Sequence, residues 1–104
     1  MLALEPGTVL TLEPGIVLRS LPDQDYYFAF NVVSGDQFRL NQTSFWVLEA
    51  ISEGTEWVRL RDSFVSVFEV SLEQGEADLA QLVNELHKEN IIGRRGHGEQ
   101  ANSL

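Results

Sequence analysis

The side chains that could carry out chemistry are abundant in this sequence, but their spacing assembles no catalytic or metal site. Cysteine is absent, and the two histidines, His87 and His97, lack the spacing of a metal-binding pair. Asp62, Ser63 and His87 are the residue types of a catalytic triad, but no pattern brings them together. Neither of the common glycine-rich phosphate-binding motifs occurs. We therefore expect no catalytic residue, no metal and no other cofactor, and a function based on binding.

The charge of the chain excludes some classes of binding partner, and its composition predicts the cellular compartment. The 16 acidic and 7 basic side chains give a net charge of −9, which repels nucleic acid and anionic membrane surfaces. No apolar run is long enough to span a bilayer, and the N-terminus lacks the features of a signal peptide. With no cysteine in 104 residues, the sequence predicts one cytoplasmic domain that binds neither nucleic acid nor a membrane.

A hairpin in the first half of the chain could position a binding edge. Residues 26–33 alternate at strand period with apolar side chains on both faces, which predicts a central strand. A turn at residues 34–36 leads to a returning strand at residues 37–40. This returning strand contains no proline, so it could present unpaired backbone groups as a sheet edge.

The two ends of the chain look less tightly held. Residues 4–10 and 12–18 repeat a Pro-Gly turn followed by a short β-prone run, which predicts two short edge strands. We expect one domain over residues 1–92, in which residues 1–15 form a loosely held arm. Residues 93–104 are polar and glycine-rich, which is typical of a flexible tail.

Three helices are predicted in the second half. The first covers residues 43–52, with Asn41 or Thr43 as its N-cap. Thr55 could cap the second helix, and a capping-box pattern at residues 71–74 opens the third.

The apolar spacing of the last two helices predicts which faces are buried. The residues expected to face the core are Trp57, Leu60, Phe64, Val67, Phe68, Leu79, Leu82, Val83 and Leu86. Gly75, in the first turn of the third helix, costs about 1 kcal/mol against alanine unless packing requires it. Strands grouped before helices predict an α+β fold that is winged-helix-like, with short N-terminal antiparallel strands followed by a three-helix bundle.

The order and spacing of these elements from residue 33 to residue 92 resemble the PqqD family, whose members are coenzyme PQQ synthesis protein D-like. The residues that carry the resemblance are Leu40-Asn41, the helix over 43–52, Gly54-Thr55, Asp78-Leu79 with Leu82, Val83 and Leu86, and Ile91-Ile92. The chain departs from the family at Gln42, where proline is frequent, and at Gly75, in a helix start usually rich in glutamate.

The resemblance implies a non-catalytic peptide chaperone. Domains of this family act as recognition elements for ribosomally made, post-translationally modified peptides (RiPPs). They capture the leader of a precursor peptide and present it to a modifying enzyme, often a radical-SAM enzyme, as in the biosynthesis of pyrroloquinoline quinone. The resemblance further implies that the leader adds a strand to the sheet edge and lies against the third helix.

The sequence offers residues for both sides of such a site. The candidates are Gln37, Phe38, Arg39 and Leu40 from the strand, and Ala77, Asp78, Gln81, Asn84 and Lys88 from the third helix. Arg39 would meet an acidic leader residue, while Phe38 and Leu40 alternate to the opposite face and join the core. The helical residues have an alternative interpretation as a plain solvated face.

Two other functions remain as alternatives to leader binding. The same edge strand could make the chain a protein–protein adaptor or a homodimer, including one formed by strand exchange. A winged-helix DNA-binding regulator ranks third, because the third helix would have to read DNA. That helix carries Glu73, Glu76, Asp78, Glu85 and Glu89 against the single Lys88, so it would repel phosphates.

Overall fold

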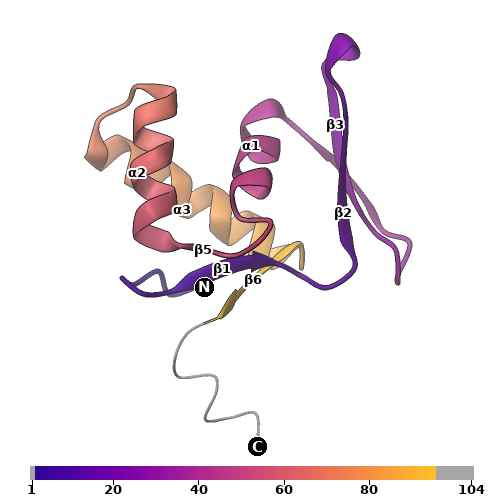
Figure 1. Ribbon diagram of the computed structural model, residues 1–104, viewed down its shortest axis with the longest axis horizontal. Coiled ribbons are helices and arrows are strands. Elements are labelled where there is room, and N and C mark those ends of the chain that lie inside the picture. The colour runs from indigo at the N-terminus through magenta and orange to yellow at the C-terminus, as the bar shows by residue number, and fades with distance from the viewer. Residues whose placement is uncertain (1, 96–104) are drawn as a thin grey trace, which may run out of the picture.

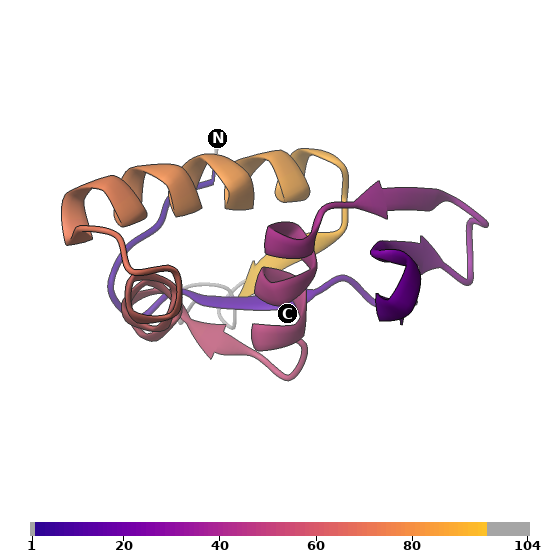
Figure 2. The ribbon, with the colours of Figure 1, turned by 90° about the horizontal axis from the view of Figure 1, so that it is seen from above.

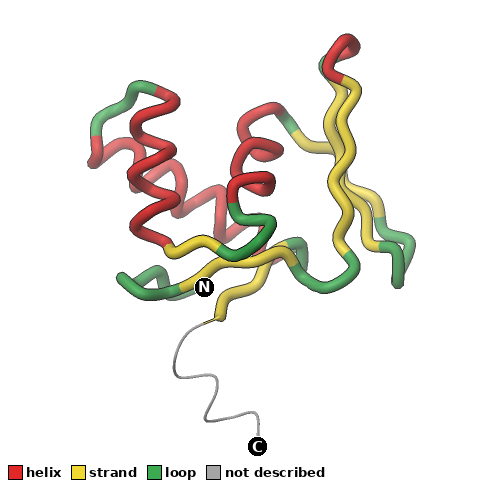
Figure 3. Tube along the Cα trace, viewed as in Figure 1, coloured by secondary structure: helices red, strands yellow, loops and turns green. Residues whose placement is uncertain are grey.

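The computed structural model describes residues 2–95, which form three α-helices and two three-stranded antiparallel sheets (Figure 1). Helix α1 (Gln42–Ala50) lies between one sheet and helix α2 (Trp57–Phe68). Helix α3 (Leu72–Lys88) runs along one side of α1 and α2 (Figure 2). The second sheet runs beneath the helices (Figure 3). The α+β class is confirmed. Two short strands, one between helices and one after the last helix, add to the strands that precede them.

The sheet beside α1 contains the predicted hairpin. Its order is β2 (Ile16–Leu21), β3 (Tyr26–Asn31) and β4 (Gln37–Leu40), so β3 is central as predicted and β4 is an edge. Leu40 lies opposite Tyr27, and Arg39 lies opposite Phe28. This register sets which side chains face α1 and which face away.

The second sheet joins distant parts of the chain. Its order is β5 (Thr55–Glu56), β1 (Val9–Leu12) and β6 (Ile92–Arg95), and β1 is the central strand. Leu10 of β1 and Ile92 of β6 are both fully buried. Since β1 and β6 come from opposite ends of the chain, their pairing leaves no local pattern in the sequence.

Both chain ends therefore take part in the fold to a greater extent than the sequence suggested. β1 lies within the stretch expected to be a loose arm, and it is a central strand rather than an edge strand. β6 extends to Arg95, past the expected domain boundary at residue 92. The rest of the expected tail, residues 96–104, lies outside the described part of the chain.

Two of the predicted helix caps are confirmed and one is wrong. The side chain of Asn41 accepts a hydrogen bond from the backbone N–H of Ser44 at 2.7 Å, which caps α1. Ser71 accepts from the N–H of Gln74 at 3.1 Å and caps α3. Thr55 does not cap α2, because its hydroxyl donates to the carbonyl of Ala50 at 2.7 Å while its backbone belongs to β5.

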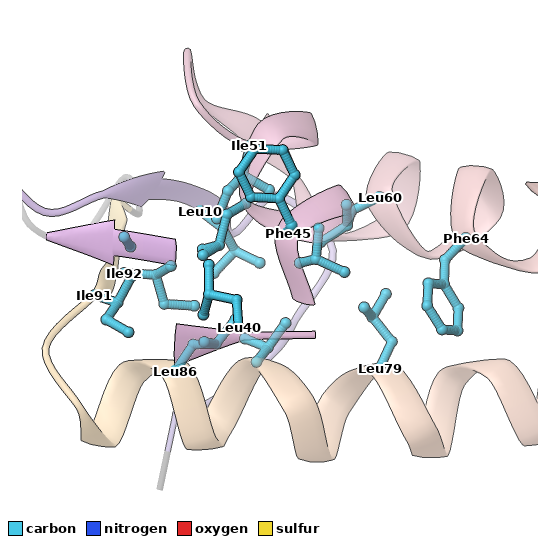
Figure 4. Packing of buried hydrophobic residues seen from close by; sticks show 14 of the residues in the cluster. Leu10, Leu40, Phe45, Ile51, Leu60, Phe64, Leu79, Leu86, Ile91 and Ile92 are labelled. Carbon is cyan, nitrogen blue, oxygen red and sulfur yellow. The ribbon is translucent and has the colours of Figure 1, made fainter. Parts of the chain in front are cut away.

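One core lies between the sheets and the helices. Figure 4 shows residues from α1, α2, α3 and both sheets meeting there, including Leu10, Leu40, Phe45, Ile51, Leu60, Leu79 and Ile92. Most of the predicted helix faces are buried, but Val67 is exposed, and Phe68 and Leu82 are only partly covered. Val67 and Leu82 lie at the margins of their helical stripes, where the sequence pattern separates core from surface least well, and Phe68 is the last residue of α2.

Packing explains the glycine at the start of α3. A Cβ at Gly75 would lie 2.6 Å from Cγ2 of Val65 and 3.0 Å from Cγ2 of Val70. Gly75 therefore lets α3 approach α2 closely, and this contact offsets its poor helix propensity. No helix within residues 2–95 is long and apolar enough to cross a membrane.

Candidate peptide-binding groove

The β4 strand has one open edge. Hydrogen-bonded and non-hydrogen-bonded pairs alternate along an antiparallel ladder. The N–H of Asn31 donates to the carbonyl of Asp36 at 2.9 Å, so the peptide groups of Phe38 and Leu40 face β3. Those of Gln37 and Arg39 consequently point away from the sheet. No strand in the described chain pairs with this side of β4.

A groove runs beside this edge, between β4 and the C-terminal half of α3. Its volume is about 620 Å³, and β4 lies next to the end of α3 in Figure 2. Its lining is mixed: the apolar residues are Phe38, Leu40, Leu82, Leu86 and Ile91, and polar residues of β4, α1 and α3 line the rest. An open backbone edge beside a groove of this kind can accept an extended peptide as an added strand.

Charged side chains of both signs border the groove. Arg39 stands on the strand side, while Glu85, Lys88 and Glu89 stand on the helix side. The guanidinium of Arg39 lies 4.1 Å from the centroid of the Tyr26 ring, which directs it toward the outer face of the sheet. The groove can thus make ion pairs with residues on either face of a bound strand.

The groove continues along β4 beyond Arg39. A neighbouring hollow of about 360 Å³ shares Arg39, Leu40 and Asn41 with it, and adds Asp25, Tyr27 and Gln42. Because the two hollows meet along one strand, a bound peptide could follow the whole length of β4 and the start of α1.

The structure brings together only some of the candidate residues. Gln37, Phe38, Arg39, Leu40 and Lys88 line the groove. Gln81, Asn84 and Lys88 line a second hollow of about 450 Å³ on α3, whereas Ala77 and Asp78 line neither. Asn84 is occupied elsewhere, since its Oδ1 accepts from the backbone N–H of Leu2 at 2.7 Å and its Nδ2 donates to the carbonyl of Ala80. Asp78 accepts a hydrogen bond from Nε2 of Gln74 at 2.8 Å.

Besides Lys88, the α3 residues that border the groove on its exposed side are Leu82, Glu85 and Glu89. These residues follow the i, i+3, i+7 spacing of one helix face, on the other side of the core stripe from Asn84. A helix has a flank on each side of its buried stripe, and the sequence alone does not say which one lies beside β4. The sequence signal that could have indicated this flank of α3 is Leu82, an apolar residue at the edge of the buried stripe.

The fold and the open edge define a class: a small α+β domain with room in its sheet for one more strand. The chain belongs to the family described as coenzyme PQQ synthesis protein D (PqqD), which residues 26–92 match. This match includes β3, β4 and all three helices, and so contains the whole groove. No curated protein matches the sequence.

Two solved structures have a similar fold. One is TbiB1 in complex with the TbiA(beta) leader peptide, with a TM-score of 0.67 and 16% identity over 79% of this chain and 93% of that one. The other is lasso peptide synthetase B1 complexed with the leader peptide, with a TM-score of 0.67 and 21% identity over 81% of this chain and 96% of that one. Both matches extend over nearly the whole of those chains.

Proposed function

We propose that this chain is a recognition module that captures the leader of a ribosomally made precursor peptide and presents it to a modifying enzyme, such as a radical-SAM enzyme. Membership of the PqqD family and the likeness to two leader-peptide complexes support this function. The single observation that carries it is the unpaired edge of β4 beside a groove that α3 closes on the other side. The chain contributes binding, and the chemistry belongs to the enzyme.

The leader binds as a fourth strand of the β2-β3-β4 sheet. It takes its backbone hydrogen bonds from the outward peptide groups of Gln37 and Arg39. Side chains of a strand alternate between its two faces, so every second leader residue enters the groove above Phe38 and Leu82. The intervening residues lie on the outer face beside Arg39.

This alternation predicts the composition of the leader. Residues that enter the groove are apolar where they meet Phe38 and Leu82, and a basic residue is favoured against Glu85 and Glu89. On the outer face, the guanidinium of Arg39 favours an acidic leader residue. A leader of this kind alternates at strand period and needs no helical structure of its own.

The test begins with a search of the genes beside this one for a short encoded precursor peptide. Its synthetic leader is titrated into the purified full-length chain by calorimetry, and then a series of leaders is made with one backbone N-methyl group each. Every N-methyl group removes one donor and leaves the side chain in place. We expect affinity to fall at every second residue of the bound segment, because only alternate peptide groups face β4.

The outcomes separate the binding modes. NMR shifts on leader addition are expected to concentrate at residues 37–41 and 82–89, where the groove lies. Loss of affinity at every third or fourth leader residue would mean that the leader binds as a helix. Absence of saturable binding by the unmodified leader would refute the proposed function.

The open β4 edge also supports a second candidate, an adaptor that pairs with the same strand of another protein or of a second copy. Sedimentation of the chain without peptide distinguishes the two functions. A homodimer that the leader does not dissociate would favour the adaptor, whereas a monomer, or a dimer that the leader dissociates, fits leader capture.

A further inference from the structure

The β2-β3-β4 sheet has a second face that the core leaves uncovered. Its members alternate with the buried residues of the same strands and are Val17, Arg19, Leu21, Tyr26, Phe28, Phe30, Gln37 and Arg39. We call this set the outer face. None of its apolar members belongs to the hydrophobic core, whereas their strand neighbours Leu18, Tyr27 and Ala29 do. Helix α1 packs on the opposite side of this sheet (Figure 2).

Three aromatic rings form a row along the middle of the outer face. The ring centroids of Tyr26 and Phe28 are 5.3 Å apart, and those of Phe28 and Phe30 are 6.1 Å apart. Leu21 at one end of the row is 49% exposed, and Val32, two residues after Phe30, is 59% exposed. An apolar surface of this kind marks an interaction site, and aromatic side chains commonly dominate the binding energy of such sites.

The charge of the outer face argues against a second copy as its partner. Arg19 and Arg39 lie on either side of Phe28, in a chain whose net charge is −9. The strands contribute no carboxylate to this face. In a two-fold dimer of outer faces, arginines would face arginines without a counter-charge. The complementary surface is therefore an apolar patch bordered by carboxylates on a different protein.

The outer face is continuous with the proposed leader site. A strand added to β4 would extend the sheet and place its outward side chains next to Gln37 and Arg39. Since Arg39 borders both the groove and the outer face, leader and aromatic row would form one surface. A protein that docks on the outer face would therefore contact the leader as well when the leader is bound to β4.

We propose that the outer face is the docking surface for the modifying enzyme, which binds it through an apolar patch bordered by carboxylates and reads the bound leader beside it. This inference rests on the proposed function and assigns the second partner of the same module. The module can present the leader to the enzyme because one sheet holds the leader at its edge and the enzyme on its outer face.

The experiment uses the full chain, together with a modifying enzyme and a precursor leader identified among the genes beside this one. Two variants alter the outer face away from the groove, Phe28→Ser and Arg19→Glu. Their matched controls on α2 are Val67→Ser and Arg59→Glu, which change an exposed apolar residue and an exposed arginine. For each variant, calorimetry measures leader affinity, and biolayer interferometry measures enzyme affinity in the presence of saturating leader.

We expect both outer-face variants to weaken enzyme binding by about tenfold or more while leader affinity changes less than about twofold. The α2 controls should bind both partners as the wild type does. Should Phe28→Ser reduce the thermal stability of the chain, the exposed Arg19→Glu variant supplies the result by itself.

Three outcomes would overturn the inference. Enzyme affinity that is unchanged in Arg19→Glu and Phe28→Ser would place docking elsewhere, and a parallel loss of leader affinity would assign these residues to the leader site. Self-association of the chain that Phe28→Ser abolishes would make a second copy the partner. If the wild type does not bind the leader at all, the proposed function itself fails, which is a result distinct from these three.

Discussion

Arg39 and Tyr26 join two neighbouring strands through a cation–π contact in which the guanidinium lies 4.1 Å from the ring centroid. The contact holds a long, exposed side chain over the outer face, next to the open edge of β4. A strand side chain that would otherwise sample many rotamers is thereby placed where an added strand must pass. The first two predictions test this position.

Reversal of the charge at position 39 should weaken leader binding. For Arg39→Glu we expect affinity to fall about fivefold at low salt, because an exposed charge at the rim of an interface contributes modestly and is screened. The variant Arg39→Gln should lie between it and the wild type, and Arg59→Glu on α2 is the matched control. Calorimetry at two salt concentrations measures the effect. A loss that persists unchanged at high salt would argue against an ionic role.

Proline substitutions at two adjacent positions of β4 should affect different properties, leader affinity at residue 39 and stability at residue 38. The N–H of residue 39 points outward and that of residue 38 points toward β3, so Arg39→Pro removes a donor for the leader and Phe38→Pro removes one from the sheet. We expect Arg39→Pro to bind the leader about tenfold more weakly than Arg39→Ala, with a similar Tm.

Phe38→Pro should instead lower the Tm, because it also removes the Phe38 ring, which packs against the core. Thermal unfolding followed by circular dichroism and leader titration together measure both effects. Equal leader affinity of Arg39→Pro and Arg39→Ala would show that the leader does not use the outward N–H of β4.

The glycine of α3 should resist replacement by alanine. Gly75→Ala improves helix propensity by about 1 kcal/mol but places a Cβ 2.6 Å from Cγ2 of Val65, so we expect a net loss of about 1–2 kcal/mol in the free energy of unfolding. The double variant Gly75→Ala, Val65→Ala should recover part of this loss. Urea denaturation measures it, with Gln81→Ala on the exposed side of α3 as control. A stabilised Gly75→Ala variant would mean that α2 and α3 separate easily.

The N-terminal strand should be essential to stability. Leu10 is fully buried in the central strand β1, so Leu10→Ala should reduce the free energy of unfolding by about 3 kcal/mol. That is a large share of the stability of a small domain. Leu72→Ala, at a half-exposed position, should cost less than about 0.5 kcal/mol. Equal behaviour of the two variants in urea would show that residues 1–15 do behave as a loose arm.

Local patterns predicted the elements that depend on neighbours in the chain. The alternation over residues 26–33 placed the central strand and its returning partner, and the polar residues at Asn41 and Ser71 marked two helix starts. Each of these features is determined within a few residues by side-chain period or by a cap. The Thr55 cap was wrong because a long-range pairing with β1 drew that residue into a strand.

The two sides of the candidate site likewise differ in how far the sequence predicted them. The residues of β4 could be proposed from the sequence, because a hairpin without proline defines its own outer strand. On the helical side only Lys88 was proposed among the groove residues, since the choice between the flank of Asn84 and the flank of Leu82 depends on how α3 is rotated against the sheets. The hydrogen bond from the N–H of Leu2 to Asn84 shows the N-terminal segment lying on one flank, and β4 faces the other.

The sequence by itself determined the acidic charge, the family, the α+β class and the edge strand with Arg39. Only the tertiary structure decided that β1 and β6 join in one sheet, that the groove lies along Leu82 and Glu85, and that an aromatic face is left uncovered. The physical reason is that strand period and helix caps are local, whereas strand pairing and helix rotation are set by distant residues that share one core.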